Sequence, residues 1–80
     1  MATVRLYSRR RCGLCDEARA VIESCRGRIA FELDEVFIDG DDALEADYGL
    51  RVPVVVVDGV EAFEYHVEPD RLEALLRVRP

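Results

Sequence analysis

The chain has 80 residues, half of them hydrophobic, and a formal net charge of −6. This length has room for one hydrophobic core, so we expect a single domain over residues 1–80. The acidic balance excludes the broad basic face that nucleic-acid binding requires. All 11 basic residues are arginine, and the lack of lysine excludes Schiff-base chemistry and P-loop phosphate binding.

The apolar segments predict no membrane partner. The first residues contain no hydrophobic stretch of the signal-peptide type. The longest apolar run, at 52–57, is much shorter than the about 20 residues that cross a bilayer. We therefore expect a cytoplasmic monomer with neither a membrane nor a nucleic-acid partner. In that reducing compartment, a closely spaced cysteine pair is more often catalytic or metal-binding than a permanent crosslink.

Hydrophobic periodicity and turn residues divide the chain into strands and helices. Apolar and β-branched residues favour strands at 3–7, 31–38, 52–57 and 60–65. Helical spacing, with glycine or acidic residues at the ends, favours helices at 12–26, 43–48 and 69–77. The predicted order is β-α-β-α-β-β-α. A strand, a crossover helix and a second strand predict that the first two strands are parallel.

Two of these strands contain irregular features. Strict alternation of apolar residues fails within 31–38, which predicts a bulge or a start nearer Glu35. Pro53 precedes four valines, and because proline has no main-chain donor we expect it at the start of its strand. The Val52–Pro53 bond can be cis at low cost although trans is commoner, so the residues alone leave both isomers open.

Two cysteines, Cys12 and Cys15, stand where the first strand gives way to the first helix. Unpaired main-chain N–H groups and the positive end of the helix dipole gather at such a helix start, and both favour a thiolate. The cluster at 9–11 adds three arginines beside Cys12. Residues three apart in a first turn lie within reach of a disulfide. The pattern predicts a redox dithiol with an activated Cys12 and a resolving Cys15.

A zinc site, a purely structural disulfide and two inert thiols are the alternatives for this pair. The remaining candidate ligands are Cys25 and His66. In a helix over 12–26, Cys25 lies about 15 Å along the axis from Cys15, which is too far for a closed zinc site. Cys25 falls on the apolar face of this helix, so we expect it to be buried and inert. We expect His66 and Tyr7 to have structural roles.

The chain resembles the glutaredoxin and thioredoxin superfamily, and in particular the short bacterial glutaredoxin-like proteins. The resemblance rests on the cysteine pair, on Val52-Pro53, on the Asp58-Gly59 hairpin and on the pattern over 44–50. It implies a thioredoxin-like α/β fold, with a four-stranded mixed sheet and helices on both faces. The first strand would be central, between a parallel second strand and an antiparallel third strand, with the fourth strand at the edge.

The resemblance also implies roles for single residues. Cys12 would be the attacking thiolate and Cys15 the resolving thiol. Pro53 would be cis and packed against the dithiol, and the main chain of Val52 would hydrogen-bond an extended thiol or peptide substrate. The basic residue near the family's site would be matched by Arg11 or by one of the two arginines before it. We expect no metal and no resident cofactor, with glutathione as a possible reductant.

Two positions depart from the family's pattern. Glutaredoxins usually carry Pro-Tyr between the cysteines, where this chain has Gly13-Leu14. After the hairpin they usually carry Gly-Gly, which lets glutathione approach the main chain, whereas this chain has Phe63-Glu64. A side chain and a negative charge there would obstruct an anionic tripeptide. Glutathione and a thioredoxin-reductase-like dithiol donor are therefore competing candidates for the reductant.

Together these patterns predict a thiol–disulfide oxidoreductase that reduces a disulfide in a protein or a small molecule. Two other activities fit the same residues. One is a binding module that keeps the fold but lacks turnover, and the other is an iron–sulfur carrier in which Cys12 from two chains holds a cluster. The thiol pKa of Cys12 separates the binding module from an enzyme, because an inert thiol keeps a pKa near about 8.5.

Overall fold

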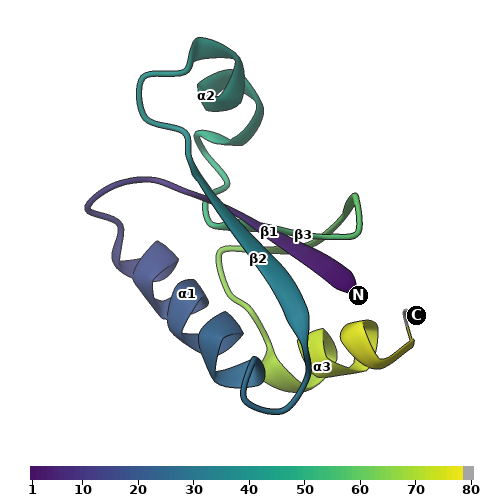
Figure 1. The fold of residues 1–80 in the computed structure, drawn as a ribbon. Coiled ribbons are helices and arrows are strands. Elements are labelled where there is room, and N and C mark those ends of the chain that lie inside the picture. Colours follow the sequence, from purple (N-terminus) through teal and green to yellow (C-terminus); the bar gives the residue numbers. More distant parts are fainter. Residues whose placement is uncertain (79–80) are drawn as a thin grey trace.

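The computed structural model describes residues 1–78, and its elements follow the predicted order (Figure 1). The strands are β1 (Ala2–Ser8), β2 (Phe31–Phe37), β3 (Val54–Val57) and β4 (Val60–Glu64). The helices are α1 (Gly13–Cys25), α2 (Asp42–Tyr48) and α3 (Pro69–Val78). In the described part of the chain, no helix has the length and apolar composition needed to cross a bilayer.

Strand β1 lies inside a mixed four-stranded sheet with the order β2-β1-β3-β4. It pairs in parallel with β2, because α1 carries the chain back to the starting end of β1 before β2 begins. It pairs antiparallel with β3, and β3 pairs antiparallel with β4 through the turn at 58–59. The topology implied by the resemblance is confirmed, and it places the end of β1 between the end of β2 and the start of β3.

The irregular apolar pattern at 31–38 has a different cause from the bulge or later start that we predicted, and that prediction is wrong. β2 begins at Phe31 and stays in unbroken register with β1 as far as Phe37. By this register Phe31, Leu33 and Phe37 lie on the face of β2 that continues the core face of β1, and the apolar pattern is irregular because Glu35 stands on that face and Val36 on the other. A register shift lies instead between β3 and β4, at Val55 and Val56.

One face of the sheet carries the hydrophobic core. Side chains from this face meet α1 and α3, which lie below the sheet in Figure 1. Residues that are completely buried there include Val4, Leu6, Ile22, Val55 and Leu72. Each such side chain contributes about 1.5–3 kcal/mol when it leaves water, so this layer supplies much of the stability of a chain this small.

Helix α2 covers only one end of the opposite face, beyond the upper end of the sheet in Figure 1. Its last residue, Tyr48, stacks on Tyr7 of β1 with the ring centroids 4.1 Å apart. This contact confirms a packing role for Tyr7. Gly49 ends α2 in a right-handed conformation, with φ −54°. A Cβ at Gly49 would collide with the carbonyl oxygen of Glu45, so glycine is needed there for space.

Two boundaries near the cysteines differ from the predicted ones. Helix α1 begins at Gly13 because Cys12 is its N-cap, with φ −120° and ψ 110°. Strand β3 begins at Val54, since Pro53 has no N–H to donate and stands just outside the ladder. Val54 pairs with Tyr7. Pro53 therefore lies beside the end of β1, from which the loop to the cysteines departs.

Leu72→Ala tests the packing of α3 on the sheet. Leu72 is fully buried, so we expect the substitution to lower the free energy of unfolding by about 2–5 kcal/mol. Leu50, which is 92% exposed, is the matched control, and Leu50→Ala should change stability by less than about 0.5 kcal/mol. Urea denaturation followed by far-ultraviolet circular dichroism measures both, and equal losses would contradict this description of the core.

Candidate active site: the Cys12 and Cys15 pair

The structure joins Cys12 and Cys15 in a disulfide, with their Cα atoms 5.2 Å apart. Cys12 precedes the first turn of α1 and is half-buried, whereas Cys15 lies within that turn and is completely buried. A partner approaching from solvent therefore meets the sulfur of Cys12 first. The two cysteines that the sequence singled out thus occupy different positions, one outer and one inner.

The main chain at the start of α1 points at the outer sulfur. The N–H of Cys15 donates a hydrogen bond to the Sγ of Cys12 at 3.1 Å. The N–H of Asp16 reaches the carbonyl oxygen of Cys12 at 3.0 Å, which closes the first turn of the helix. An amide donor and the positive end of the helix dipole favour a negatively charged sulfur. The main chain at the start of α1 is therefore arranged to favour a thiolate at Cys12 when the disulfide opens.

Of the three consecutive arginines, two are held by other groups. Arg9 donates to both carboxylate oxygens of Glu45, at 2.6 and 3.0 Å, and to the carbonyl oxygen of Gly49 at 3.1 Å. Its charge ties the loop to α2. Arg10 donates its main-chain N–H to Asp39 at 2.9 Å and holds its guanidinium over the ring of Phe37. Both guanidinium groups are therefore held by other residues, and neither is available chiefly to stabilise a thiolate at the cysteine pair.

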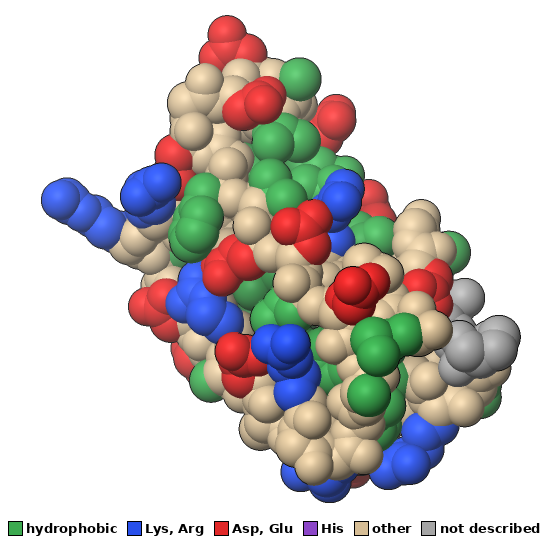
Figure 2. Space-filling view, in the orientation of Figure 1, with side chains coloured by type: hydrophobic (Ala, Val, Ile, Leu, Met, Phe, Trp, Pro, Cys, Tyr) green, Lys and Arg blue, Asp and Glu red, His purple; other side chains and the backbone are tan. Residues whose placement is uncertain are grey.

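Arg11 is the member of the cluster that remains available. It is exposed, with φ +56°, and its side chain makes no hydrogen bond or ion pair with any residue among 1–78. Figure 2 shows arginine side chains projecting at the left of the view, level with the β1–α1 connection of Figure 1. The sequence could not distinguish among the three arginines, because their partners on β2 and α2 come from distant parts of the chain.

The Val52–Pro53 peptide bond is cis, as the resemblance implied. Pro53 is buried, and its carbonyl oxygen accepts the N–H of Tyr65 at 2.9 Å. Tyr65 also donates its hydroxyl to the carbonyl oxygen of Leu50 at 2.7 Å, so it holds both sides of this loop. The main chain of Val52 makes no hydrogen bond to another residue in the described chain, and it is open to an extended partner.

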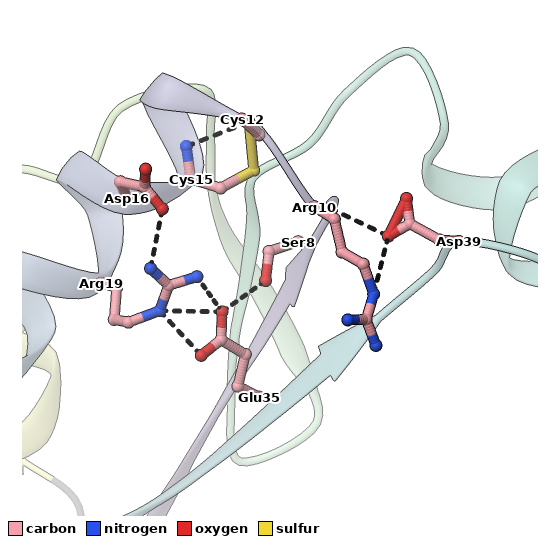
Figure 3. Close-up of polar contacts among 8 residues, drawn as sticks. All are labelled: Ser8, Arg10, Cys12, Cys15, Asp16, Arg19, Glu35 and Asp39. Atoms are coloured by element: carbon pink, nitrogen blue, oxygen red, sulfur yellow. Dashed lines mark hydrogen bonds and ion pairs between the residues drawn. A yellow bond between two sulfur atoms is a disulfide. The ribbon is translucent and has the colours of Figure 1, made fainter.

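A second polar group near the cysteines was missed by sequence reasoning. Ser8 is completely buried at the end of β1, and its hydroxyl donates to Glu35 of β2 at 2.6 Å. Arg19 of α1 donates its Nε to both oxygens of Glu35, at 2.8 and 3.0 Å, and its Nη1 to Asp16 at 2.9 Å (Figure 3). Hydrogen bonds from Arg19, and then from Ser8, hold the pKa of Glu35 below its usual value despite burial.

This network could be found only in part from the sequence. Asp16 and Arg19 stand three apart on α1, a spacing that favours an ion pair. Glu35 joins them because Leu6 and Ser8 of β1 face the core, and the parallel register places Glu35 opposite Leu6. Its side chain therefore points toward α1. The sequence alone does not give this register, so it does not distinguish Glu35 from the other acidic residues.

The other candidate ligands lie away from the pair. Cys25 is buried at the opposite end of α1, where burial raises the pKa of its thiol, so it is buried as expected. His66 is exposed on the connection between β4 and α3. Within residues 1–78, no three histidine, cysteine or acidic side chains gather in a way that could hold a metal ion.

Comparisons with known proteins agree with this fold. The family model of the glutaredoxin-like domain (DUF836) matches residues 3–77, and the chain belongs to that family. A structural-genomics target protein from X. campestris is 40% identical, with a TM-score of 0.76 over 96% of this chain and 99% of that chain. Protein Ne2328 from Nitrosomonas europaea is 31% identical, with a TM-score of 0.80 over 94% of this chain and 91% of that chain.

The likeness extends to the thioredoxins at the level of the fold. A mutant thioredoxin from Halobacterium salinarum has a TM-score of 0.70 and 24% identity, over 96% of this chain and 73% of that chain. The chain is therefore a glutaredoxin-like protein with the thioredoxin fold, and its CxxC spacing fits redox activity.

Arg11→Gln tests whether the free guanidinium acts on the outer sulfur. We expect the pKa of the Cys12 thiol to rise, because a nearby positive charge favours the thiolate and its removal favours the thiol. Arg10→Gln is the matched control and should change this pKa less, since Asp39 and Phe37 already hold Arg10. Thiolate absorbance during a pH titration of the reduced protein measures both, and equal effects would contradict the assignment to Arg11.

Proposed function

We propose that this protein is a thiol–disulfide oxidoreductase that reduces disulfides in proteins or small molecules. The observation that carries the proposal is the asymmetric pair: an accessible Cys12 that caps α1, joined to a completely buried Cys15. An accessible sulfur held by an amide donor suits attack on a partner. A buried second sulfur, in reach of the first, suits release of that partner.

The reaction would proceed by two thiol–disulfide exchanges. In the first, the Cys12 thiolate attacks one sulfur of the partner, a mixed disulfide forms, and the partner's other sulfur leaves as a thiolate. In the second, Cys15 loses its proton and attacks the Sγ of Cys12, and the partner's remaining sulfur leaves. Two electrons pass to the partner, and the Cys12–Cys15 disulfide remains. An external thiol must then return two electrons to this disulfide.

Two further parts of the site support binding of a partner. The free main chain of Val52 can pair with an extended segment beside the disulfide, as an added strand does. The exposed charge of Arg11 attracts an acidic group on the incoming substrate. A dithiol that works as a reductant needs a reducing compartment, so we propose that the protein acts in the cytoplasm.

Serine variants of the two cysteines test the mechanism. Cys12→Ser should abolish reduction of a model protein disulfide, because it removes the nucleophile. Cys15→Ser should instead accumulate a mixed disulfide with the substrate, since the resolving thiol is missing. Cys25→Ala, which changes a thiol outside the site, should keep turnover. Insulin reduction and non-reducing gel electrophoresis measure these outcomes, and a Cys12→Ser variant with unchanged turnover would refute the proposal.

We also propose that a dithiol reductase, rather than glutathione, reduces the Cys12–Cys15 disulfide. Phe63 is buried in the core, and Glu64 carries an exposed carboxylate that pairs with Arg51 at 3.0 Å. By the resemblance, these two residues correspond to the positions where the family's Gly-Gly admits glutathione. Arg51 also pairs with Glu61 at 2.8 Å, so two carboxylates share one guanidinium, and the negative charge left over disfavours an anionic tripeptide.

Parallel assays with two electron sources test this choice of reductant. Turnover with thioredoxin reductase and NADPH should exceed turnover with glutathione, glutathione reductase and NADPH. Glu64→Gln should raise the glutathione rate alone, because it removes a negative charge from the approach. NADPH oxidation is followed in both assays. Faster turnover with glutathione by the unmodified protein would overturn the preference and leave the dithiol mechanism intact.

A further inference from the structure

Three charged side chains lie on the inner side of the cysteine pair. Arg19 binds Glu35 with two guanidinium nitrogens and Asp16 with a third, and the buried hydroxyl of Ser8 completes the group. They come from α1, β1 and β2, so the network ties the first turn of the helix to the ends of two strands (Figure 3). None of the steps proposed above uses these residues.

Helix geometry places this group next to the inner sulfur. Arg19 follows Cys15 by four residues, and such residues are neighbours on a helix surface, with Cβ atoms about 5–6 Å apart. Asp16 directly follows Cys15 in the chain. Glu35 is fixed to Arg19 by hydrogen bonds, and its side chain is only 20% exposed. A partly buried charge is screened much less than a surface charge.

The charges of the group do not cancel. Two carboxylates and one guanidinium leave one net negative charge, because the hydroxyl of Ser8 is neutral. Glu17, also in the first turns of α1, is exposed, and Arg10 with Asp39 forms a separate pair that is neutral. The inner side of the site is therefore negative, whereas the helix start and Arg11 make its outer side positive.

We propose that Glu35 and Arg19 are positioning residues that set the reduction potential of the Cys12–Cys15 disulfide in opposite directions. Reduction by dithiothreitol adds two electrons and one proton, giving a Cys12 thiolate and a Cys15 thiol, while dithiothreitol becomes its cyclic disulfide and its second proton is released to the solvent. The carboxylate of Glu35 disfavours the new negative charge and makes the protein more reducing. The positive charge of Arg19 partly cancels the charge of the two carboxylates, so it makes the protein less reducing than the carboxylates alone would. The inference rests on the proposed function, for which a reducing dithiol is required.

Paired variants test the inference by the sign of the change. Glu35→Gln removes a carboxylate and leaves Arg19 less neutralised, so the equilibrium constant for reduction by dithiothreitol should rise. A rise of about tenfold would correspond to about 30 mV toward a more oxidising potential. Arg19→Gln leaves two carboxylates without their cation, so the same constant should fall by a comparable factor. The equilibrium is measured in dithiothreitol redox buffers by counting free thiols.

Control variants separate electrostatics from a loss of structure. Glu73 of α3 pairs with Arg28 near the other end of α1, so Glu73→Gln changes the net charge equally and should leave the equilibrium unchanged. Asp16→Asn removes an exposed acid beside Cys15, and it should act in the direction of Glu35→Gln even if that variant folds poorly. A purely structural role would move Glu35→Gln and Arg19→Gln in the same direction.

The outcomes distinguish this inference from the proposed function. Opposite shifts for Glu35→Gln and Arg19→Gln, with no shift for Glu73→Gln, would support it. Shifts of one sign, or shifts that Glu73→Gln reproduces, would overturn it. Because the measurement is an equilibrium with a small dithiol, it needs no turnover of a partner. A protein without disulfide reductase activity would refute the proposed function while the electrostatic result still stood.

Discussion

The main-chain N–H of Cys15 donates to the Sγ of Cys12, and this contact joins the start of α1 to the accessible sulfur of the site. Most helix caps are oxygen acceptors from serine, threonine or aspartate side chains. A cysteine cap differs because its acceptor gains a full negative charge when a disulfide opens, and charged acceptors bind amides more strongly. The stability of the helix end and the formation of a thiolate therefore favour the same local structure.

The sheet gives this helix end its place in the molecule. β1 leads into it from the middle of the sheet, with the end of β2 on one side and the start of β3 on the other. Pro53, which precedes Val54, thus comes to lie beside the end of β1, from which the cysteine loop departs. Arg9 fixes the loop itself, because its guanidinium binds Glu45 in α2 and the carbonyl oxygen of Gly49, which caps the end of that helix. The site depends on packing of distant segments as much as on the CxxC sequence.

The two sulfurs lie in fields of opposite sign. Cys12 faces solvent, a helix start and the free charge of Arg11, all of which favour a thiolate. Cys15 is completely buried in the same first turn of α1 that carries Asp16, and Asp16 shares Arg19 with Glu35; we propose that this negative group favours a thiol at Cys15. If the outer sulfur ionises and the inner sulfur keeps its proton, Cys12 attacks a partner first and Cys15 reacts only in the second step. In the proposed function, the same opposition would adjust how strongly the pair reduces its partners.

The amino-acid sequence by itself determined the order of the elements, the pairing of the cysteines across one helical turn and the burial of Cys25. These follow from periodicity, turn residues and spacing, which are local properties. Only the tertiary structure decided which arginine is free, that β2 is unbroken, and that Glu35 reaches Arg19 and Ser8. Those features depend on which strands are neighbours and in what register. A chain's local pattern predicts its elements, but a charge acquires its partner only when the elements are packed together.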